Sequence, residues 1–347
     1  MSALPRSNPA NDKADALHLG VAIHETWSFF HEIYAELAAH FQTSLFEPRL
    51  SQSPFFKERM NRYLFERDLA RFLSANQVVF FEWASDWLAA ASHLPKRSAL
   101  VCRLHRYELY QWADAVNWDG VDRVILVSEA KRREFAARFP EQAGKTAVVP
   151  EAISLSRFQP LDRPFGGDLG ILCHLSPRKR VYELILAFSE LAPRSAKFHL
   201  HIGGGPHPRF PDYPYVLRDL VSRLGLQDRV TFYGDVKDSE AWYRRIDIFI
   251  SNSYSEGLQV SPMEAIASGC YCLSHIWDGA GELLPGENLY LTDRELVEKV
   301  LAYSEAAAPQ KLRLRKRLRS LIVDNFNVDQ TKLRIRQLIE QTSRQYA

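Results

Sequence analysis

Cysteine is scarce in this chain, and neither sign of charge dominates it. The four cysteines are too few for a disulfide scaffold and form no Cys-x-x-Cys pair, so buried thiols in a reducing compartment are expected. Lys and Arg number 44 against 42 for Asp and Glu, a formal net charge of +2. This balance gives no electrostatic reason to expect a nucleic-acid partner.

Long apolar runs are also missing. A membrane span needs about 20 unbroken apolar residues, and the best candidate, residues 78–91, is interrupted by Glu82 and Asp86. Residues 1–20 are polar and contain no apolar core of the length found in signal peptides. A soluble, cytoplasmic protein is therefore expected.

What the chain does contain is a regular alternation of short apolar runs with helical patterns, over a length of 347 residues that suits two domains. Runs that are apolar without alternation are typical of strands buried on both faces, and alternation with helices indicates a parallel sheet. The fold class predicted is α/β, with two doubly wound Rossmann-like domains. The predicted strands are 19–23, 78–83, 99–104, 124–127, 147–149, 169–175, 198–202, 230–233, 246–251 and 271–274.

Proline and glycine interrupt the pattern between residues 158 and 167. We therefore expect one domain over 1–160 and a second over 161–326. A long charged helix is expected over 54–73, and a closing amphipathic helix within 327–347.

Basic residues cluster with leucines between residues 311 and 319. One interpretation is a patch for an anionic membrane surface or acceptor, which allows peripheral membrane contact. The other, which we favour, is a solvated helix face with its leucines packed inward.

The most informative stretch is 246–265, which reads as a strand, a polar loop and a helix. Open α/β folds bind ligands where such loops leave the sheet, and free amides at a helix start hold anions such as diphosphates. Glu256 and Glu264 lie in this stretch and suit sugar or ribose hydroxyls. Alternatively, Ser261 caps the helix and Glu264 completes a capping box.

The two glutamates, followed by Ala265, Ala267 and Gly269, resemble the signature of retaining glycosyltransferases of family four (glycosyl transferases group one), which have the GT-B architecture. Further stretches from about residue 77 onward resemble the same family in order. They are 122–129, 149–160, 174–180, 199–206 and 230–234.

The resemblance implies catalytic roles for three residues: His105, Lys179 and Glu256. It implies donor contacts for residues of two loops in the second domain: His174, Arg178, Lys179, Glu256, Gly257, Leu258, Gln259 and Glu264. In this family pattern Glu256 holds the transferred sugar, Glu264 the ribose, and Lys179 neutralises the diphosphate.

The activity implied is transfer of a hexose-type sugar from a UDP- or GDP-linked donor to a glycan, glycolipid or other hydroxyl acceptor. The configuration would be retained, with the leaving phosphate as base and with neither a cofactor nor a bound metal. In the family the closing helix crosses back onto the first domain, so that 327–347 is expected to pack there.

The sequence departs from the family pattern in two places. His174 stands where an Arg is usual, and a histidine, unlike an arginine, is largely neutral at pH 7. The glycine-rich turn after the first strand is replaced by a segment with His24, Glu25 and Trp27. These three are candidates for an acceptor site, although Trp27 suits the core equally well.

These departures favour a second hypothesis, a catalytically degenerate protein that binds nucleotide or glycan without turnover. The presence of Lys179, Glu256 and Glu264 together favours the enzyme instead.

Overall fold

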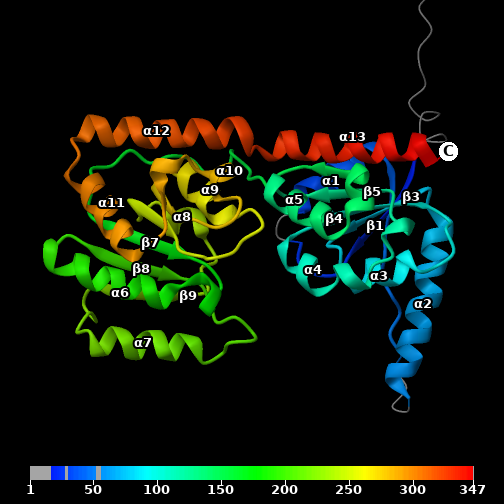
Figure 1. The fold of residues 1–347 in the computed structure, drawn as a ribbon, viewed down its shortest axis with the longest axis horizontal. Helices are drawn as coiled ribbons and strands as arrows, with labels where there is room; N and C mark the ends of the chain where they lie inside the picture. Colours follow the sequence, from blue (N-terminus) through cyan, green and yellow to red (C-terminus); the bar gives the residue numbers. More distant parts are fainter. Residues whose placement is uncertain (1–16, 28–29, 52–55, 347) are drawn as a thin grey trace, which may run out of the picture. The chain divides into compact units, whose positions relative to one another are not determined.

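The computed structural model describes residues 17–27, 30–51 and 56–346. The chain forms two compact units: unit 1 comprises residues 1–150 and 329–347, and unit 2 comprises 151–328 (Figure 1). Most of the polar N-terminal segment and the first two residues of the helix expected over 54–73 lie outside the described residues.

Unit 1 is built on a parallel sheet with the strand order β2-β1-β3-β4-β5-β6. Its strands are β1 (His18–Ile23), β2 (Gln42–Leu45), β3 (Val78–Glu82), β4 (Ala99–Leu104), β5 (Arg123–Leu126) and β6 (Thr146–Val148). Its α-helices are α1 (His31–His40), α2 (Lys57–Ala75), α3 (Asp86–Ser92), α4 (Arg106–Gln111), α5 (Glu129–Arg138) and α13 (Val328–Tyr346). Alternate residues of β3 and β4 enter two separate apolar clusters, so both sides of the sheet are buried.

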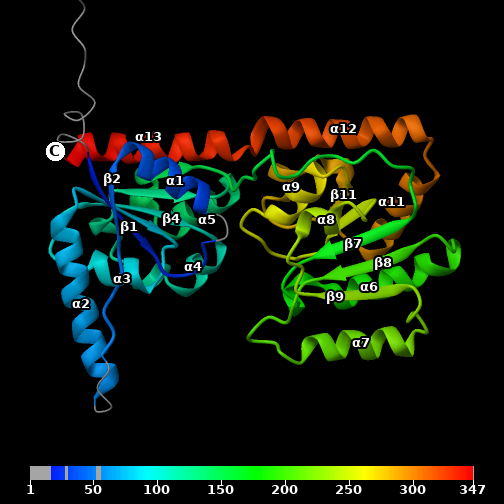
Figure 2. The same cartoon turned by 180° about the vertical axis from the view of Figure 1, so that it is seen from behind.

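Unit 2 has a second parallel sheet with the order β12-β11-β10-β7-β8-β9. Figure 2 shows β7, β8 and β9 of this sheet from behind. Its strands are β7 (Asp168–Leu172), β8 (His199–Gly203), β9 (Val230–Gly234), β10 (Ile248–Ser251), β11 (Tyr271–His275) and β12 (Leu289–Tyr290). Its α-helices are α6 (Val181–Leu191), α7 (Tyr213–Arg223), α8 (Ser239–Tyr243), α9 (Val260–Ala267), α10 (Ala280–Leu283), α11 (Asp293–Glu305) and α12 (Ala308–Asn325).

The predicted α/β class is confirmed, and each predicted run overlaps one strand of a parallel sheet. Two strands were not predicted, β2 and β12. Both are edge strands: β2 has the largely polar sequence QTSL, and β12 is only two residues long. Neither therefore carries the apolar run by which a buried strand is recognised.

The two units divide at Pro150, earlier than the boundary expected at residue 160. The intervening residues pack with unit 2: the Ile153 amide donates to the Phe326 carbonyl over 3.0 Å, and the buried Phe158 ring contacts Tyr243. Helix α13 begins at Val328, and its Ile335 and Ile339 lie in the core cluster of unit 1. Within the described part of the chain, no helix combines the length and apolarity needed to cross a bilayer.

Candidate functional site

Two loops of unit 2 meet at the carboxyl edge of its sheet. One follows β7 and leads through the short helical turn Pro177–Lys179 into α6, and the other follows β10 and leads into α9. Since β7 and β10 are neighbouring parallel strands, their loops emerge side by side. The Tyr254 amide donates to the Arg178 carbonyl over 3.3 Å, which ties the loops together.

A left-handed residue at the start of α6 presents the basic side chains. Arg180 has φ 51°, a conformation that a non-glycine residue keeps only when its surroundings hold it. The Asn252 amide group donates to the Arg180 carbonyl over 2.8 Å, and the Tyr290 hydroxyl donates to Asn252 over 2.6 Å. The Arg180 guanidinium also pairs with Asp293 at 2.9 Å. These contacts fix the turn that carries Arg178 and Lys179.

Glu256 is buried between these two cations. Its Oε1 lies 2.6 Å from Lys179 Nζ and 2.7 Å from Arg178 Nη1. Burial alone would raise the pKa of Glu256, but the charges of Lys179 and Arg178 outweigh it and lower the pKa to about 2. Glu256 is therefore ionised at neutral pH and held in one place as a hydrogen-bond acceptor.

Helix α9 begins with its first amides uncapped by a side chain. The N-cap is Gln259, whose side chain accepts a hydrogen bond from Ser251 rather than capping the helix. Gly257 and Leu258 lead into this start and are buried. The capping box considered for Ser261 and Glu264 is wrong, because the helix starts before Ser261. Uncapped amides at a helix start form a site suited to an anion.

Glu264 lies farther along α9 and accepts a hydrogen bond from the hydroxyl of the buried Tyr243 over 2.9 Å. Burial raises the pKa of Glu264 to about 7, although the Tyr243 hydrogen bond and the charge of Arg157 act to lower it. The carboxylate therefore gains and loses its proton near neutral pH.

His174 follows β7 and is exposed, and its ring meets that of His207 edge-on with centroids 6.5 Å apart. Next to His174, the segments that follow β7 and β8 come so close that the position of Gly204 requires glycine. Gly204 has φ 119°, and a Cβ there would lie 1.7 Å from the Cys173 carbonyl oxygen. No larger residue allows the loops after β7 and β8 to approach so closely.

Unit 1 brings its own candidate residues to the carboxyl edge of its sheet. His105 follows β4 and is buried, with Nε2 3.0 Å from Glu82 Oε1 at the end of β3. Its ring stacks on Trp83 with centroids 4.1 Å apart. Trp83 has φ 76° and donates its Nε1–H to the Thr26 carbonyl over 3.2 Å. These contacts hold the imidazole in one orientation.

The loop after β1 reaches the same edge. His24 Nδ1 lies 2.8 Å from Asp86 Oδ1, and its ring stacks on Trp87. Glu25 accepts a hydrogen bond from the Tyr107 hydroxyl. Trp27 instead lies half-buried beside α1, where it joins the unit 1 core cluster. His24 and Glu25 thus share this edge with His105.

Sequence reasoning missed several residues that position the candidates. They are Glu82, Trp83, Asp86, Trp87, Tyr107, Tyr243, Asn252 and Tyr290. Three of them carried a usable signal, since Glu82 and Trp83 end a predicted strand and Asn252 directly follows another. Nothing in the spacing of Tyr243 or Tyr290 pointed to Glu264 or Arg180.

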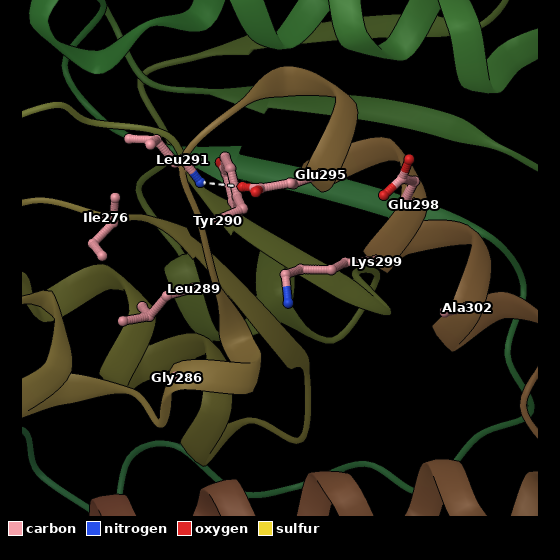
Figure 3. A pocket seen from close by; sticks show the side chains of 9 residues that line it. All are labelled: Ile276, Gly286, Leu289, Tyr290, Leu291, Glu295, Glu298, Lys299 and Ala302. Carbon is pink, nitrogen blue, oxygen red and sulfur yellow. Dashed lines mark hydrogen bonds between the residues drawn. The ribbon is translucent and has the colours of Figure 1, made fainter.

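A separate hollow of about 560 Å³ lies beside β12 and α11 (Figure 3). Glu295 closes one side of it by accepting a hydrogen bond from the Leu291 amide over 2.7 Å, and the same carboxylate completes the capping box of α11. None of the residues lining this hollow is among the predicted donor contacts.

Residues 167–305 match the family model described as Glycosyl transferases group 1. The chain is 29% identical over 167 residues to D-inositol 3-phosphate glycosyltransferase 2 of Catenulispora acidiphila, covering 44% of this chain and 39% of that protein. It is 34% identical over 134 residues to the lipopolysaccharide core biosynthesis mannosyltransferase LpcC of Rhizobium leguminosarum bv. viciae, covering 35% and 37% respectively. The matched segments thus span less than half of either curated relative.

Solved structures match the whole fold. The structure of HepE from Anabaena in complex with UDP has a TM-score of 0.75 at 18% identity and covers 94% of this chain and 100% of that chain. A glycosyltransferase from Rickettsia africae has a TM-score of 0.75 at 14% identity, covering 94% and 99%. Residues 167–305 are therefore similar to the group 1 glycosyltransferases, as the sequence motifs predicted, and the chain has the predicted GT-B fold.

Proposed function

We propose that this chain is a retaining glycosyltransferase that moves a hexose-type sugar from a UDP- or GDP-linked donor to a hydroxyl of a glycan, glycolipid or other acceptor. The observation that carries the proposal is the ionised Glu256, fixed by Lys179 and Arg178 beside the uncapped start of α9. This arrangement offers acceptors for sugar hydroxyls and donors for a diphosphate within a few residues.

In the proposed complex, Glu256 accepts hydrogen bonds from the sugar hydroxyls, supported by the amides of Gly257 and Leu258. Glu264 accepts from the ribose, and its burial leaves little water to compete. Lys179, Arg178 and the amides around Gln259 neutralise the diphosphate, and His174 adds a further donor at the end of β7.

The proposed reaction breaks the bond between the anomeric carbon and the phosphate oxygen and forms a bond from that carbon to the acceptor oxygen on the same face. The departing phosphate takes the acceptor proton, so no side chain need serve as base. The positive groups near the phosphates stabilise the charge that develops on the leaving group, a contribution typically of about 3 kcal/mol per donor. No metal or cofactor takes part in this scheme.

On the acceptor side, we propose that His105 contacts the transferred sugar and that His24 and Glu25 border the acceptor, whereas Trp27 packs against the unit 1 core instead. The support is the fixed orientation of His105 on Trp83 and Glu82, together with the position of His24 and Glu25 at the same sheet edge. A cytoplasmic location suits a nucleotide-sugar donor and is part of the proposal.

The test is donor hydrolysis by the purified chain, measured as nucleoside diphosphate released from UDP- and GDP-linked hexoses. Glu256→Gln should lower the rate about 100-fold or more, because it removes the charge between Lys179 and Arg178. Glu240→Gln, in an exposed pair with Arg244, is the matched control and should leave the rate unchanged.

The same assay decides between the enzyme and the degenerate alternative. A degenerate protein would bind nucleotide but release no diphosphate above background with any donor. A rate that Glu256→Gln leaves unaltered would also contradict the proposal.

A further inference from the structure

The segments that follow β7 and β8 in unit 2 stay paired beyond the ends of the two strands. The Leu175 amide donates to the Gly205 carbonyl over 2.9 Å, and the His207 amide donates to the Leu175 carbonyl over 3.1 Å. These bonds extend the parallel pairing as an isolated bridge between Leu175 and Pro206. The loop after β8 therefore brings His207 beside His174, and the two rings meet edge-on with centroids 6.5 Å apart.

The turn that follows fixes how the His207 ring carries its proton. The Arg209 amide donates to His207 Nδ1 over 3.1 Å, and the Phe210 amide donates to the His207 carbonyl over 2.8 Å. Because Nδ1 accepts a hydrogen bond, the neutral His207 ring has its proton on Nε2. No residue in the described part of the chain accepts a hydrogen bond from Nε2. His207 is half-buried, so the ring has an unused donor and is still accessible.

Positive charge gathers around this ring. Burial lowers the pKa of His207, and four neighbouring side chains that can carry positive charge lower it further. They are His174, Arg209, Arg178 and Lys179. Arg178 and Lys179 share one carboxylate, because both contact Glu256 Oε1. The cluster therefore keeps positive charge for an anionic ligand.

We propose that His207 Nε2 and the Arg209 guanidinium are further contacts of the donor diphosphate, supplied by the loop after β8. This inference rests on the proposed function and adds to it, since the other proposed phosphate contacts come from the loops after β7 and β10. His174 stands where an arginine is usual, which leaves the site one permanent charge short. Arg209 supplies a permanent charge from the neighbouring loop, and His207 supplies a positioned N–H donor.

The alternative is that His207 only shapes its turn through Nδ1. Two substitutions separate these roles. His207→Asn keeps an acceptor near the position of Nδ1 and removes the donor at Nε2, whereas His207→Gln keeps a donor near the position of Nε2 and removes the acceptor near Nδ1. A phosphate contact predicts that the Gln variant binds the diphosphate more tightly than the Asn variant does. A role in the turn alone does not.

The test is calorimetric affinity of the full chain for UDP and GDP. The diphosphate that the unmodified chain binds should bind His207→Asn about tenfold or more weakly, because a donor to a charged group is lost. Arg209 is exposed, so Arg209→Gln should weaken binding less, about threefold. Both variants should lose less affinity for the corresponding monophosphate, UMP or GMP, which brings one phosphate instead of two.

Each substitution has a matched control in unit 2. His199 is half-buried at the start of β8, where it contacts Thr231, and Arg223 forms an exposed pair with Asp219. His199→Asn and Arg223→Gln should bind UDP or GDP as the unmodified chain does. Thermal melts of all variants show whether each is folded.

The possible failures are distinguishable. If the unmodified chain binds neither UDP nor GDP, the proposed function fails, and this inference fails with it. If the chain binds one of them and the folded variants His207→Asn and Arg209→Gln bind it equally well, this inference alone is overturned. Equal losses for the monophosphate and the diphosphate would also overturn it, as would a Gln variant at position 207 that binds no better than the Asn variant.

Discussion

The carboxyl group of Glu264 gives the sharpest quantitative prediction. Burial raises its pKa from 4.5 to about 7 in the folded chain. The folded state therefore holds a proton that the unfolded state has already lost, so between about pH 4.5 and 7 this group makes stability fall as pH rises. The shift of about 2.5 pH units, at 1.36 kcal/mol each, corresponds to about 3 kcal/mol.

Glu264→Gln removes this titration and leaves an amide oxygen that can still accept from Tyr243. The variant should therefore gain stability relative to the unmodified chain as pH rises from 5 to 8, by about 2.5 kcal/mol, since part of the titration lies below pH 5. Tyr243→Phe should move the titration of Glu264 to higher pH, because the Tyr243 hydrogen bond favours the ionised carboxylate.

Urea unfolding at several pH values, followed by tryptophan fluorescence, measures the difference between each variant and the unmodified chain. Trp242 and Trp277 report on unit 2 because both are buried in it. The reasoning would be refuted if the difference in unfolding free energy between Glu264→Gln and the unmodified chain stayed constant from pH 5 to 8. It would also be refuted if the variant lost stability relative to the unmodified chain as pH rose.

Three further predictions concern the loops of unit 2. Lys179→Ala should slow donor hydrolysis about 100-fold, because Glu256 and the diphosphate both lose a cation. Lys237 is exposed, so Lys237→Ala should leave the rate unchanged, and equal rates for the two variants would count against the site. Gly204→Ala should lower the free energy of unfolding, measured by thermal melts, by about 3 kcal/mol or more. A Cβ at Gly281 meets no atom within 4 Å, so Gly281→Ala is the control and should not lower it; a Gly204→Ala variant of unchanged stability would contradict the close approach of the segments after β7 and β8. His174→Arg should strengthen the calorimetric affinity for UDP or GDP, because an arginine brings a permanent charge and a planar pair of donors to the diphosphate; an unchanged affinity would exclude the role.

Much of the fold could be predicted because buried parallel strands carry a strong signal. The run 99–104 coincides with β4, since a strand covered on both faces is largely apolar. Its one charged residue, Arg103, is buried in an ion pair with Glu82. Strands β2 and β12 were not predicted, because a strand at the edge of a sheet does not need an unbroken apolar run. The unit boundary at Pro150 could not be predicted, because Ile153 and Phe158 pack on unit 2 through contacts with residues that are distant in the sequence.

The candidate site could be predicted only in part, for a related reason. Glu256 and Lys179 were found through a short motif, but the pairing of Arg178 with Glu256 depends on the left-handed turn at Arg180. Tyr243 meets Glu264 from a different helix, so neither spacing nor composition could connect them. Side chains that position other side chains become visible only when tertiary contacts are known.

The position of a bound nucleoside diphosphate tests the central claim most directly. In a crystal structure of the full chain with UDP or GDP, the account predicts the diphosphate within hydrogen-bond reach of Lys179 Nζ and the first amides of α9, with the ribose on Glu264. A nucleotide bound elsewhere on unit 2, with Glu256 and Glu264 untouched, would contradict it.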